Sequence, residues 1–340
     1  MRDTHVMDAT ETQFSADVLA IDPEQVTATI AEAISSQVLG TLRRRGVVVG
    51  LSGGIDSSVC AALSVRALGA KRVLGVFMPE RDSSDDSLYL GRLLAAHLGI
   101  ETIVENIAPP LVAAGCYERQ NEAIRSVFPE YAEGWKCKIT LPSLLNGDRL
   151  NIFSLTVMNP TGEMKTARLP LSAYLQLVAA TNFKQRLRAT MAYYHADRLN
   201  FAVVGTPNRL EYDQGFFVKG GDGAADLKPI AHLYKTQVYA LAEHLGVPEE
   251  IRRRPPTTDT YSMPQTQEEF YFALPYGAMD LCLYAHNHGV SPQEVAAALG
   301  LTEPQVAAVF KDIDAKRRTT RYLHLSPLLV EKVAEISEPY

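Results

Sequence analysis

The segment VVVGLSGGIDSSVCAALSVRALG, residues 47–69, joins a hydrophobic run, a glycine-rich turn and a helical pattern without a break. Its first five residues have the length and β-branched composition of a buried strand, and we expect a helix over 57–68 that ends at Gly69. A strand that is apolar throughout is typical of a parallel sheet covered by helices on both faces. The segment therefore predicts an α/β fold with a tight, small-residue turn at the end of a buried strand.

The same alternation of apolar strands and helices continues along the chain. We expect further strands at 72–79, 101–107 and 201–206, and helices at 23–42, 84–100, 181–200 and 233–246. This order predicts a doubly wound, Rossmann-like parallel sheet. Short strands around the turn Asn159–Gly162 predict a small β-rich insertion at about 131–172. The expected organisation is a flexible leader over 1–22, a sheet domain over 23–260 that contains the insertion, and a helical C-terminal extension over 261–340.

Composition argues against several classes of protein. A formal charge of −6 and a pI near 5.8 disfavour an electrostatic nucleic-acid binder, which would carry a basic surplus. The four cysteines are scattered without a C-x-x-C pair, so neither a zinc site nor a disulfide framework is expected and a reducing compartment is favoured. No signal peptide is evident, and no apolar run approaches the roughly 20 residues that span a bilayer. We expect a cytoplasmic globular protein with neither a membrane nor a nucleic-acid partner.

Four interpretations of the turn at 50–57 compete. A Walker P-loop requires a lysine after the glycines, and none follows here. Gly50–Gly54 matches the G-x-S-x-G nucleophile elbow, but only about 50 residues with one expected helix precede it, and they contain no H-G-G-G motif. A purely structural turn is the third interpretation, because small residues also allow close helix–sheet packing. The fourth interpretation is a loop that binds pyrophosphate.

The pyrophosphate interpretation accounts for more of the residues in the turn. Gly53 and Gly54 would let backbone N–H groups approach phosphate oxygens, and the following helix would point its positive dipole end at the same anion. The neighbouring serines add hydroxyl donors. Asp56 would not bind phosphate itself but could hold Mg²⁺ that bridges phosphates. A purely structural turn does not need this carboxylate.

The residues GLSGGIDSS resemble the S-G-G-x-D-S loop of N-type ATP pyrophosphatases, which split ATP between the α and β phosphates to adenylate an acceptor. Three further segments narrow the resemblance to the ammonia-dependent NAD synthetase family. They are the stretch 201–238 with its G-T-x-N-x-x-E, K-x-G-D-G-x-x-D and L-x-K patterns, the helix NFKQRLRATMAYYHA, and the loop RRRPPTTD. With FMPERDSSDDS, the resemblance covers most of 23–260 and implies an adenine nucleotide alpha hydrolase-like fold.

The resemblance implies a two-step reaction. The nicotinate carboxylate of deamido-NAD attacks the α-phosphate of Mg·ATP and releases pyrophosphate, and ammonia then attacks the acyl-adenylate to give NAD and AMP. The family also implies Mg²⁺ as cofactor and a homodimer whose interface builds part of the dinucleotide site. Only about 22 residues precede the first expected helix, so no glutaminase domain is expected. The ammonia would be free or delivered by a separate partner.

The resemblance also implies roles for individual residues. ATP would be bound by Gly50, Leu51, Ser52, Gly53, Gly54, Ile55, Asp56, Ser57, Thr206, Lys235 and Thr257. Asp56 and Glu211 would hold Mg²⁺, and Asp56 and Lys235 would be the catalytic residues. Deamido-NAD would be bound by Arg186, Lys219, Asp226 and Lys316. Arg188, two positions after Arg186 on the same expected helix, is expected at the surface.

Two features depart from the family pattern. Ala315 stands where the family has a histidine before Lys316 and the arginine pair 317–318. The insertion is absent from the short bacterial members, and could be a dimer element, a lid or a change of acceptor. These departures leave open a related ligase that acts on another carboxylate. A third hypothesis is a nucleotide-sensing regulator with a helix-turn-helix-like tail over 291–318, although acidic residues precede the bases in its second helix.

Overall fold

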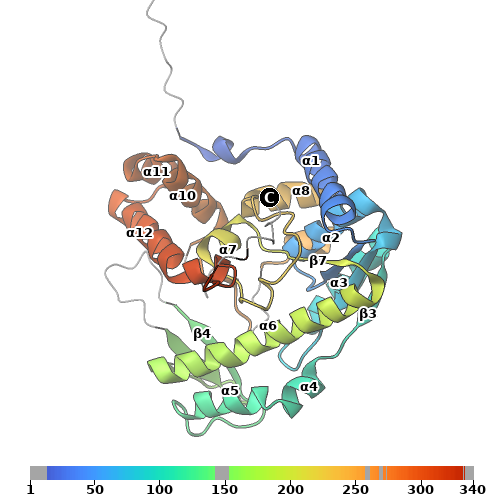
Figure 1. The fold of residues 1–340 in the computed structure, drawn as a ribbon. Coiled ribbons are helices and arrows are strands. Elements are labelled where there is room, and N and C mark those ends of the chain that lie inside the picture. The colour runs from blue at the N-terminus through green and yellow to red at the C-terminus, as the bar shows by residue number, and fades with distance from the viewer. Residues whose placement is uncertain are drawn as a thin grey trace, which may run out of the picture.

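The computed structural model describes residues 14–141, 153–256, 261–267, 271–272, 274–331 and 333. A four-stranded parallel sheet in the order β3-β2-β1-β7 carries the fold (Figure 1). Its strands are β1 (Val47–Gly50), β2 (Val73–Phe77), β3 (Glu101–Val104) and β7 (Ala202–Val204). β1 lies in the middle, where Val48 is level with Leu74 of β2 and with Val203 of β7.

One face of the sheet is covered by four helices: α1 (Pro23–Ser35), α2 (Ile55–Leu68), α3 (Asp85–Leu98) and α8 (Lys235–His244). Their apolar side chains pack against Val47 and Val49 of β1. The Asp22 carboxylate caps α1 by accepting hydrogen bonds from the backbone N–H groups two and three residues further on. The helix then continues as a π-helical turn over Ser36–Thr41.

The long helix α6 (Leu171–Leu199) covers the other face of the sheet. Ala192 and Ala196 of α6 pack against Val48, Leu74 and Val203, one from each of the three strands that α6 crosses. Neighbouring residues of β1 therefore point into different apolar layers, which is why the strand is hydrophobic at successive positions. The expected doubly wound parallel α/β sheet is confirmed.

A second, antiparallel sheet lies within the range expected to be β-rich. It consists of β4 (Lys136–Thr140), β5 (Ser154–Met158) and β6 (Met164–Arg168), and it packs with α5 (Cys116–Arg125) and the first half of α6. The short helix α4 (Ala108–Ala113) precedes α5. Asn159 and Gly162 form the turn between β5 and β6, where Gly162 has a φ of +89°. Residues 142–152 of the expected insertion lie outside the described part.

The C-terminal part is helical, with α10 (Tyr276–His288), α11 (Pro292–Leu299), α12 (Glu303–Thr320) and a 3₁₀ turn at Arg321–His324. These helices share a hydrophobic cluster with Leu210 of α7 (Arg209–Gln214) and with Tyr234, so they form a packed layer. The short helix α9 (Glu249–Arg253) follows α8. Figure 1 shows α10–α12 on the side of the molecule opposite α1–α3. Neither these helices nor any other described helix has the length and apolarity needed to cross a membrane.

Residues 14–22 correct the expectation of a flexible leader over 1–22. Phe14 and Leu19 are buried in the C-terminal hydrophobic cluster, and the Phe14 ring stacks on Tyr284 with their centroids 6.4 Å apart. Ser15 caps a short 3₁₀ helix at Ala16–Leu19. Burial of two large apolar side chains fixes this stretch, and the polar residues around them conceal that signal in the sequence. Residues 1–13 lie outside the described part.

Candidate active site

A cavity of about 1040 Å³ opens at the carboxyl ends of the parallel strands. The segments that follow β1, β2 and β7 line one part of it, and residues of α6 and of the end of α12 line the rest. The chain order in the sheet reverses between β1 and β7. Ligands of open α/β sheets bind at such a switch point, so the fold itself indicates this cavity as a binding site.

The loop after β1 has the close packing that its glycines predict. Gly53 has a φ of +73°, and a Cβ at this position would lie 2.5 Å from the backbone carbonyl oxygen of Ser87. Gly54 is the N-cap of α2, so the helix begins at Ile55, two residues before the expected start. Asp56 therefore lies in the first turn of the helix, at the dipole end that attracts anions.

The loop hydroxyls bond mainly within the loop. The Oγ atoms of Ser52 and Ser57 are 3.1 Å apart, and the Ser57 hydroxyl also donates to the carbonyl of Gly54 at 3.0 Å. Ser58 is buried and donates to the same carbonyl at 2.8 Å, so it stabilises the helix start and does not line the cavity. The described partners of Ser52 are a hydroxyl and the N–H of Gly54, whereas a hydrolase nucleophile would need a histidine.

Asp56 contacts two side chains that come from distant parts of the sequence. Its Oδ2 lies 2.5 Å from Nζ of Lys235, and its Oδ1 accepts a hydrogen bond from Nδ2 of Asn208 at 3.0 Å. Lys235 is the first residue of α8 and is fully buried. Its backbone N–H donates to the buried carboxylate of Asp280 at 3.1 Å, which fixes the start of α8 beside Asp56.

Glu211 joins the same cluster through Asn208. The two residues form a capping box at the start of α7, in which Asn208 Oδ1 accepts from the N–H of Glu211 and Glu211 Oε2 accepts from the N–H of Asn208. The other Glu211 oxygen accepts a hydrogen bond from Nε2 of Gln267 at 3.1 Å. The capping box thus brings Glu211 to the side of Asp56.

The cluster places two carboxyl groups, Asp56 and Glu211, beside a single ammonium, that of Lys235. Burial and the Asp56 carboxylate raise the pKa of Glu211 to about 8, against a smaller opposing effect of Lys235. Burial lowers the pKa of Lys235, but Asp56 and Glu211 outweigh burial and raise it overall. Glu211 therefore holds a proton at neutral pH. Mg²⁺ is commonly bound by one or two carboxylates while phosphates and water supply the other ligands, so Asp56 and Glu211 are suitable donors for it.

Three residues of the cluster were given no role from the sequence, although Asn208 is part of the G-T-x-N-x-x-E pattern. Asn208 carried a signal, because a helix start with Asn followed three positions later by Glu is a capping-box pattern. Gln267 and Asp280 carried none, since their partners Glu211 and Lys235 are 56 and 45 positions away. Only the packing of the C-terminal helices against α7 and α8 brings them to the site.

Most of the residues predicted to bind ATP line the cavity. They are Gly50, Leu51, Ser52, Gly54, Ile55, Asp56, Ser57 and Thr206. Gly53 is packed against Ser87, and Lys235 is buried behind Asp56, so neither forms part of the cavity wall. Thr257 lies outside the described residues.

Arg186 and Lys219, predicted to bind the dinucleotide, line the same cavity and contact each other. Nε of Arg186 donates to the backbone carbonyl of Lys219 at 3.2 Å. Nζ of Lys219 donates to the backbone carbonyls of Tyr322 at 2.9 Å and of Leu325 at 2.7 Å. Lys219 therefore also connects the cavity to the segment that follows α12.

Lys316, the third predicted cation of the dinucleotide site, lines the cavity from α12 together with Ala315. Its Nζ lies 2.7 Å from Oδ2 of Asp312 and donates to the carbonyl of Tyr271 at 2.7 Å. Burial lowers the pKa of Lys316, and the Asp312 carboxylate only partly opposes this shift. The Ala315 position leaves this stretch of wall with only a methyl group where the family pattern has a histidine.

Two residues lie elsewhere than expected. Asp226 does not line the cavity of the single chain, and its carboxylate accepts hydrogen bonds from the N–H of Val203 at 2.7 Å and from the Tyr193 hydroxyl at 3.3 Å. It is used to hold the start of the loop after β7 against that strand. Arg188, expected at the surface, lines the cavity, and its Nε donates to the carbonyl of Met78 at 3.4 Å.

The family model described as NAD synthase matches residues 26–128 and 153–321, so only 129–152 interrupts the match. Two curated relatives named NH(3)-dependent NAD(+) synthetase are similar over almost the whole chain. The protein of Mesorhizobium japonicum is 65% identical over 94% of this chain and 100% of its own length, and that of Rhizobium meliloti is 61% identical over 95% and 96%.

Solved structures share the fold at low sequence identity. An NMN synthetase from Francisella tularensis superposes with a TM-score of 0.62 at 22% identity, covering 91% of this chain and 99% of its own. An NH3-dependent NAD synthetase from Campylobacter jejuni gives a TM-score of 0.57 at 22% identity, covering 92% and 100%. The family match and the identity of the curated relatives together establish that this chain belongs to the NAD synthase family.

Proposed function

We propose that this protein is an ammonia-dependent NAD synthetase that adenylates the nicotinate carboxylate of deamido-NAD with ATP and amidates it with ammonia. The observation that carries the proposal is the Asp56–Lys235 pair, joined through Asn208 to Glu211, beside the Gly53 turn in a cavity at the switch point of the sheet. Curated relatives at 65% and 61% identity bear the name of this activity.

The Mg²⁺ ion that the family implies would be held by the carboxylates of Asp56 and Glu211. When bound, it would neutralise phosphate charge as pyrophosphate leaves. Lys235, buried behind Asp56 with its ammonium on that carboxylate, supplies a second positive charge near the phosphates. The turn at Gly53 and the N-terminus of α2 add backbone N–H groups. With these groups the protein aligns two anionic substrates, and no side chain acts as a covalent nucleophile.

Arg186, Lys219 and Lys316 form the proposed binding site for the phosphates and the carboxylate of deamido-NAD, because all three line the cavity. Asp226 is exposed but does not line the cavity of its own chain. It would therefore contact a dinucleotide only if that dinucleotide were bound by a second subunit across an interface. Replacing Asp226 by Ala should then raise the KM for deamido-NAD without changing the affinity for ATP.

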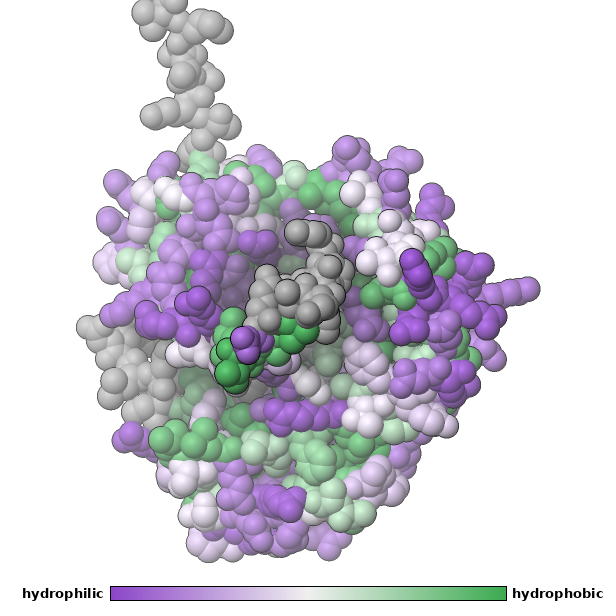
Figure 2. Space-filling view, in the orientation of Figure 1, coloured by the Kyte–Doolittle hydropathy of each residue, from purple (hydrophilic) through white to green (hydrophobic). Residues whose placement is uncertain are grey.

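We also propose a homodimer, because Asp226 would need a second subunit to reach the dinucleotide. Leu171 and Leu175 on α6 and Met164 on β6 are large apolar residues with exposed fractions of 72%, 56% and 63%. Figure 2 shows hydrophobic side chains gathered over the lower half of the molecule, where Figure 1 draws α6 and α5. A second copy of the chain would cover such a surface. Light scattering after gel filtration measures the oligomer, and Leu171→Glu with Leu175→Glu should shift it toward the monomer.

We propose a cytoplasmic location. All four cysteines are free and buried, which suits a reducing compartment where no disulfide is required. Immunodetection in fractionated cells checks this location.

A related ligase that amidates another carboxylate is the second candidate. Ala315 favours it, because this residue lines the cavity where the family pattern has a histidine. One assay separates the candidates: pyrophosphate release from ATP is measured with and without ammonium, in the presence of deamido-NAD or of other carboxylic acids. Release that requires deamido-NAD and yields NAD supports the first function. Release only with other acids supports the second, and nucleotide binding without turnover would remove both.

A further inference from the structure

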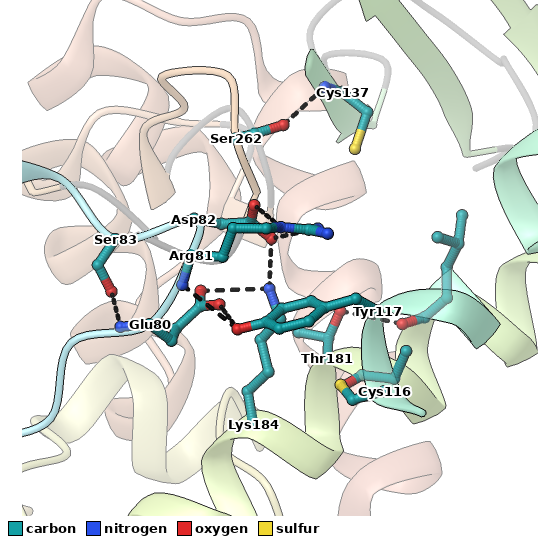
Figure 3. Close-up of polar contacts among 12 residues, drawn as sticks. Glu80, Arg81, Asp82, Ser83, Cys116, Tyr117, Cys137, Thr181, Lys184 and Ser262 are labelled. Carbon is teal, nitrogen blue, oxygen red and sulfur yellow. Dashed lines mark hydrogen bonds and ion pairs between the residues drawn. The ribbon is translucent and has the colours of Figure 1, made fainter. Parts of the chain in front are cut away.

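A second buried lysine, Lys184 of α6, lies among carboxylates outside the Asp56 site. Its side chain is 2% exposed, and its Nζ lies 3.2 Å from Oε1 of Glu80 and 2.6 Å from Oδ2 of Asp82. Figure 3 shows both carboxylates approaching the ammonium from the segment that follows β2. The hydroxyl of Tyr117, from α5, donates to the other Glu80 oxygen at 2.8 Å. Three separate elements therefore meet at the Lys184 ammonium.

Charges and hydrogen bonds in this cluster are balanced. Arg81 donates from Nε and from a terminal nitrogen to the two Asp82 oxygens at 3.0 and 3.2 Å, and its guanidinium lies 4.0 Å from the centroid of the Tyr117 ring. Each oxygen of the two carboxylates thus accepts a hydrogen bond, and two cations face two anions. Burial raises the pKa of Asp82, but Lys184 and Arg81 outweigh it and lower the pKa overall. Such a cluster is suited to hold parts of the fold in place.

The segment that Lys184 holds forms part of the cavity wall. Pro79, Ser83, Ser84 and Ser87 all line the cavity, and Glu80 and Asp82 are interspersed among them. The backbone N–H of Glu80 donates to the Ser83 hydroxyl at 3.1 Å, which closes this turn. The carbonyl of Ser87 is the atom that a Cβ on Gly53 would meet, so the segment also abuts the glycine-rich loop.

The same lysine holds a second wall of the cavity. Its neighbours in α6, Asn182, Gln185 and Arg186, line the cavity, and Arg188, one turn further on, donates to the carbonyl of Met78 at the end of β2. Two successive turns of α6 are therefore fastened to the stretch 78–82, which follows β2. A displacement at Lys184 would move two cavity walls relative to each other.

We propose that Lys184 is a positioning residue for the synthetase reaction, which fixes segment 79–87 against α6 and so supports the glycine-rich loop at Gly53. The proposal rests on the proposed function, because the loop at Gly53 is assigned to ATP. Lys184 does not itself line the cavity, so its effect reaches ATP through Ser87 and Gly53.

The test measures ATP binding separately from turnover. Calorimetry gives the affinity of Lys184→Met for Mg·ATP in the absence of acceptor, and steady-state kinetics give kcat and KM for ATP. Small misplacements of binding groups cost up to about 100-fold, so we expect kcat/KM for ATP to fall by about 10- to 100-fold, mostly through KM. Lys184→Arg, which keeps the charge, should recover part of the loss.

Val295→Ala provides the control for stability. Val295 is fully buried in α11, and no described residue of that helix lines the cavity. This variant should unfold at a lower temperature than the wild type and bind Mg·ATP normally. A fall in ATP affinity in both variants would trace the effect to general destabilisation and would overturn the positioning role.

The outcomes separate the two proposals. Wild-type protein that binds Mg·ATP but makes no NAD removes the proposed function, while the binding comparison still decides the role of Lys184. Folded Lys184→Met with wild-type affinity and KM for ATP overturns the positioning role. If Lys184→Met does not fold, Tyr117→Phe decides, because it keeps every charge and removes two hydrogen bonds of the cluster: the one that the Tyr117 hydroxyl donates to Glu80 and the one that it accepts from the backbone N–H of Arg81. A raised KM for ATP supports the proposal, and an unchanged KM overturns it.

Discussion

Lys235 and Lys184 are both buried and each faces two carboxylates, but the charges around them differ. Lys235 balances only one of Asp56 and Glu211, and the pKa of Glu211 is raised to about 8. At Lys184, Arg81 supplies the second positive charge, and the pKa of Asp82 is lowered. The first cluster borders the cavity and is neutral only because Glu211 holds a proton that a bound cation would displace, whereas the second is balanced by its own side chains and sits behind the cavity wall.

This difference is the one expected between a reactive cluster, as proposed for Asp56, and an anchoring cluster, as proposed for Lys184. The Asp56 side chain is 16% exposed, so the first cluster is open to ligands, while Glu80 and Asp82 are 0% and 5% exposed. Two buried carboxyl groups that share one cation are costly to ionise together, and a protein tolerates such an arrangement where a bound ligand supplies the missing positive charge. Substitutions in the first cluster should therefore affect turnover most, and those in the second should affect stability and loop placement.

The largest effect is expected for Asp56→Asn. Loss of this proposed Mg²⁺ ligand should lower the rate of pyrophosphate release by at least about 100-fold. The fold should remain stable, because removal of the Asp56 charge lowers the pKa of Glu211, which can then ionise and pair with Lys235. Pyrophosphate assays and thermal unfolding measure the two quantities.

Asp314→Asn is the matched control for this substitution. Asp314 pairs with His286 on the surface and is 55% exposed, so the control should leave both quantities unchanged. Near-normal turnover by Asp56→Asn would contradict the assignment of the glycine-rich loop.

The second prediction compares the two lysines directly. Lys184→Met leaves two buried carboxylates with Arg81 as the one balancing cation among the described residues, and should lower the free energy of unfolding by about 3–5 kcal/mol. Lys235→Met should lower it less, because Glu211 is already protonated at neutral pH and Asp56 borders the cavity. Urea unfolding monitored by circular dichroism gives both values. Equal losses in the two variants would mean that both clusters serve as anchors.

The third prediction concerns pH. The pKa of Glu211 is about 8 in the folded protein and 4.5 as its ordinary value, so the folded state binds the extra proton between these limits. Stability therefore falls as the pH rises from about 4.5 to 8, by at most about 1.4 kcal/mol per pH unit, and this contribution levels off above pH 8. Glu211→Gln should remove this contribution to the pH dependence of the free energy of unfolding. The contribution is obtained by measuring unfolding of the wild type and of Glu211→Gln at successive pH values and taking the difference.

The same proton links pH to metal binding. Mg²⁺ requires the ionised carboxylate, so affinity for Mg·ATP should increase as the pH rises toward 8. Calorimetry in buffers of different ionisation enthalpy detects the released proton. Proton release that persists in Glu211→Gln would assign the linkage to another group.

The sheet and the glycine-rich loop could be predicted from the sequence because their signals are local. The apolar run at 47–51 and the spacing of Gly53, Gly54 and Asp56 are contained in ten residues. The start of α2 was placed two residues late because Gly54, a weaker cap than Ser or Asn, takes the capping position. The flexible leader was wrong for 14–22 because Phe14 and Leu19 find their apolar partners only in the C-terminal helices.

The Lys184 cluster shows what a single sequence conceals. Glu80, Arg81 and Asp82 form a run of charged residues, which by itself predicts a solvated turn. The burial of the Glu80 and Asp82 carboxylates depends on α6, about a hundred positions later, which supplies the compensating lysine. Lys184 likewise lies on a helix where a surface lysine would be unremarkable. Pairing over such a separation leaves no periodic or spacing signal, so only the tertiary fold identifies the cluster.

The smallest effect is expected for Asp280→Asn. The two Asp280 oxygens accept hydrogen bonds from the N–H groups of Lys235 at 3.1 Å and of Thr236 at 2.8 Å, and the residue belongs to α10. Asparagine keeps one acceptor oxygen, so loss of the other should reduce the free energy of unfolding by about 1–2 kcal/mol. Because these bonds fix the backbone at the start of α8, the rate of pyrophosphate release should fall modestly, by about threefold. Such a decrease corresponds to an increase of less than about 1 kcal/mol in the activation free energy.

Asp280→Asn also tests whether the C-terminal helices take part in the active site. We have assigned Lys235 to the reactive cluster because of the charges around it. A shift of α8, which begins at Lys235, should therefore lower the rate of pyrophosphate release. A loss of stability with an unchanged rate would show that α10 only holds α8 in place. A lower rate of pyrophosphate release with a normal KM for ATP would show that α10 contributes to the reactive cluster. This result is expected if Asp280 acts by positioning Lys235 and not by shaping the cavity wall.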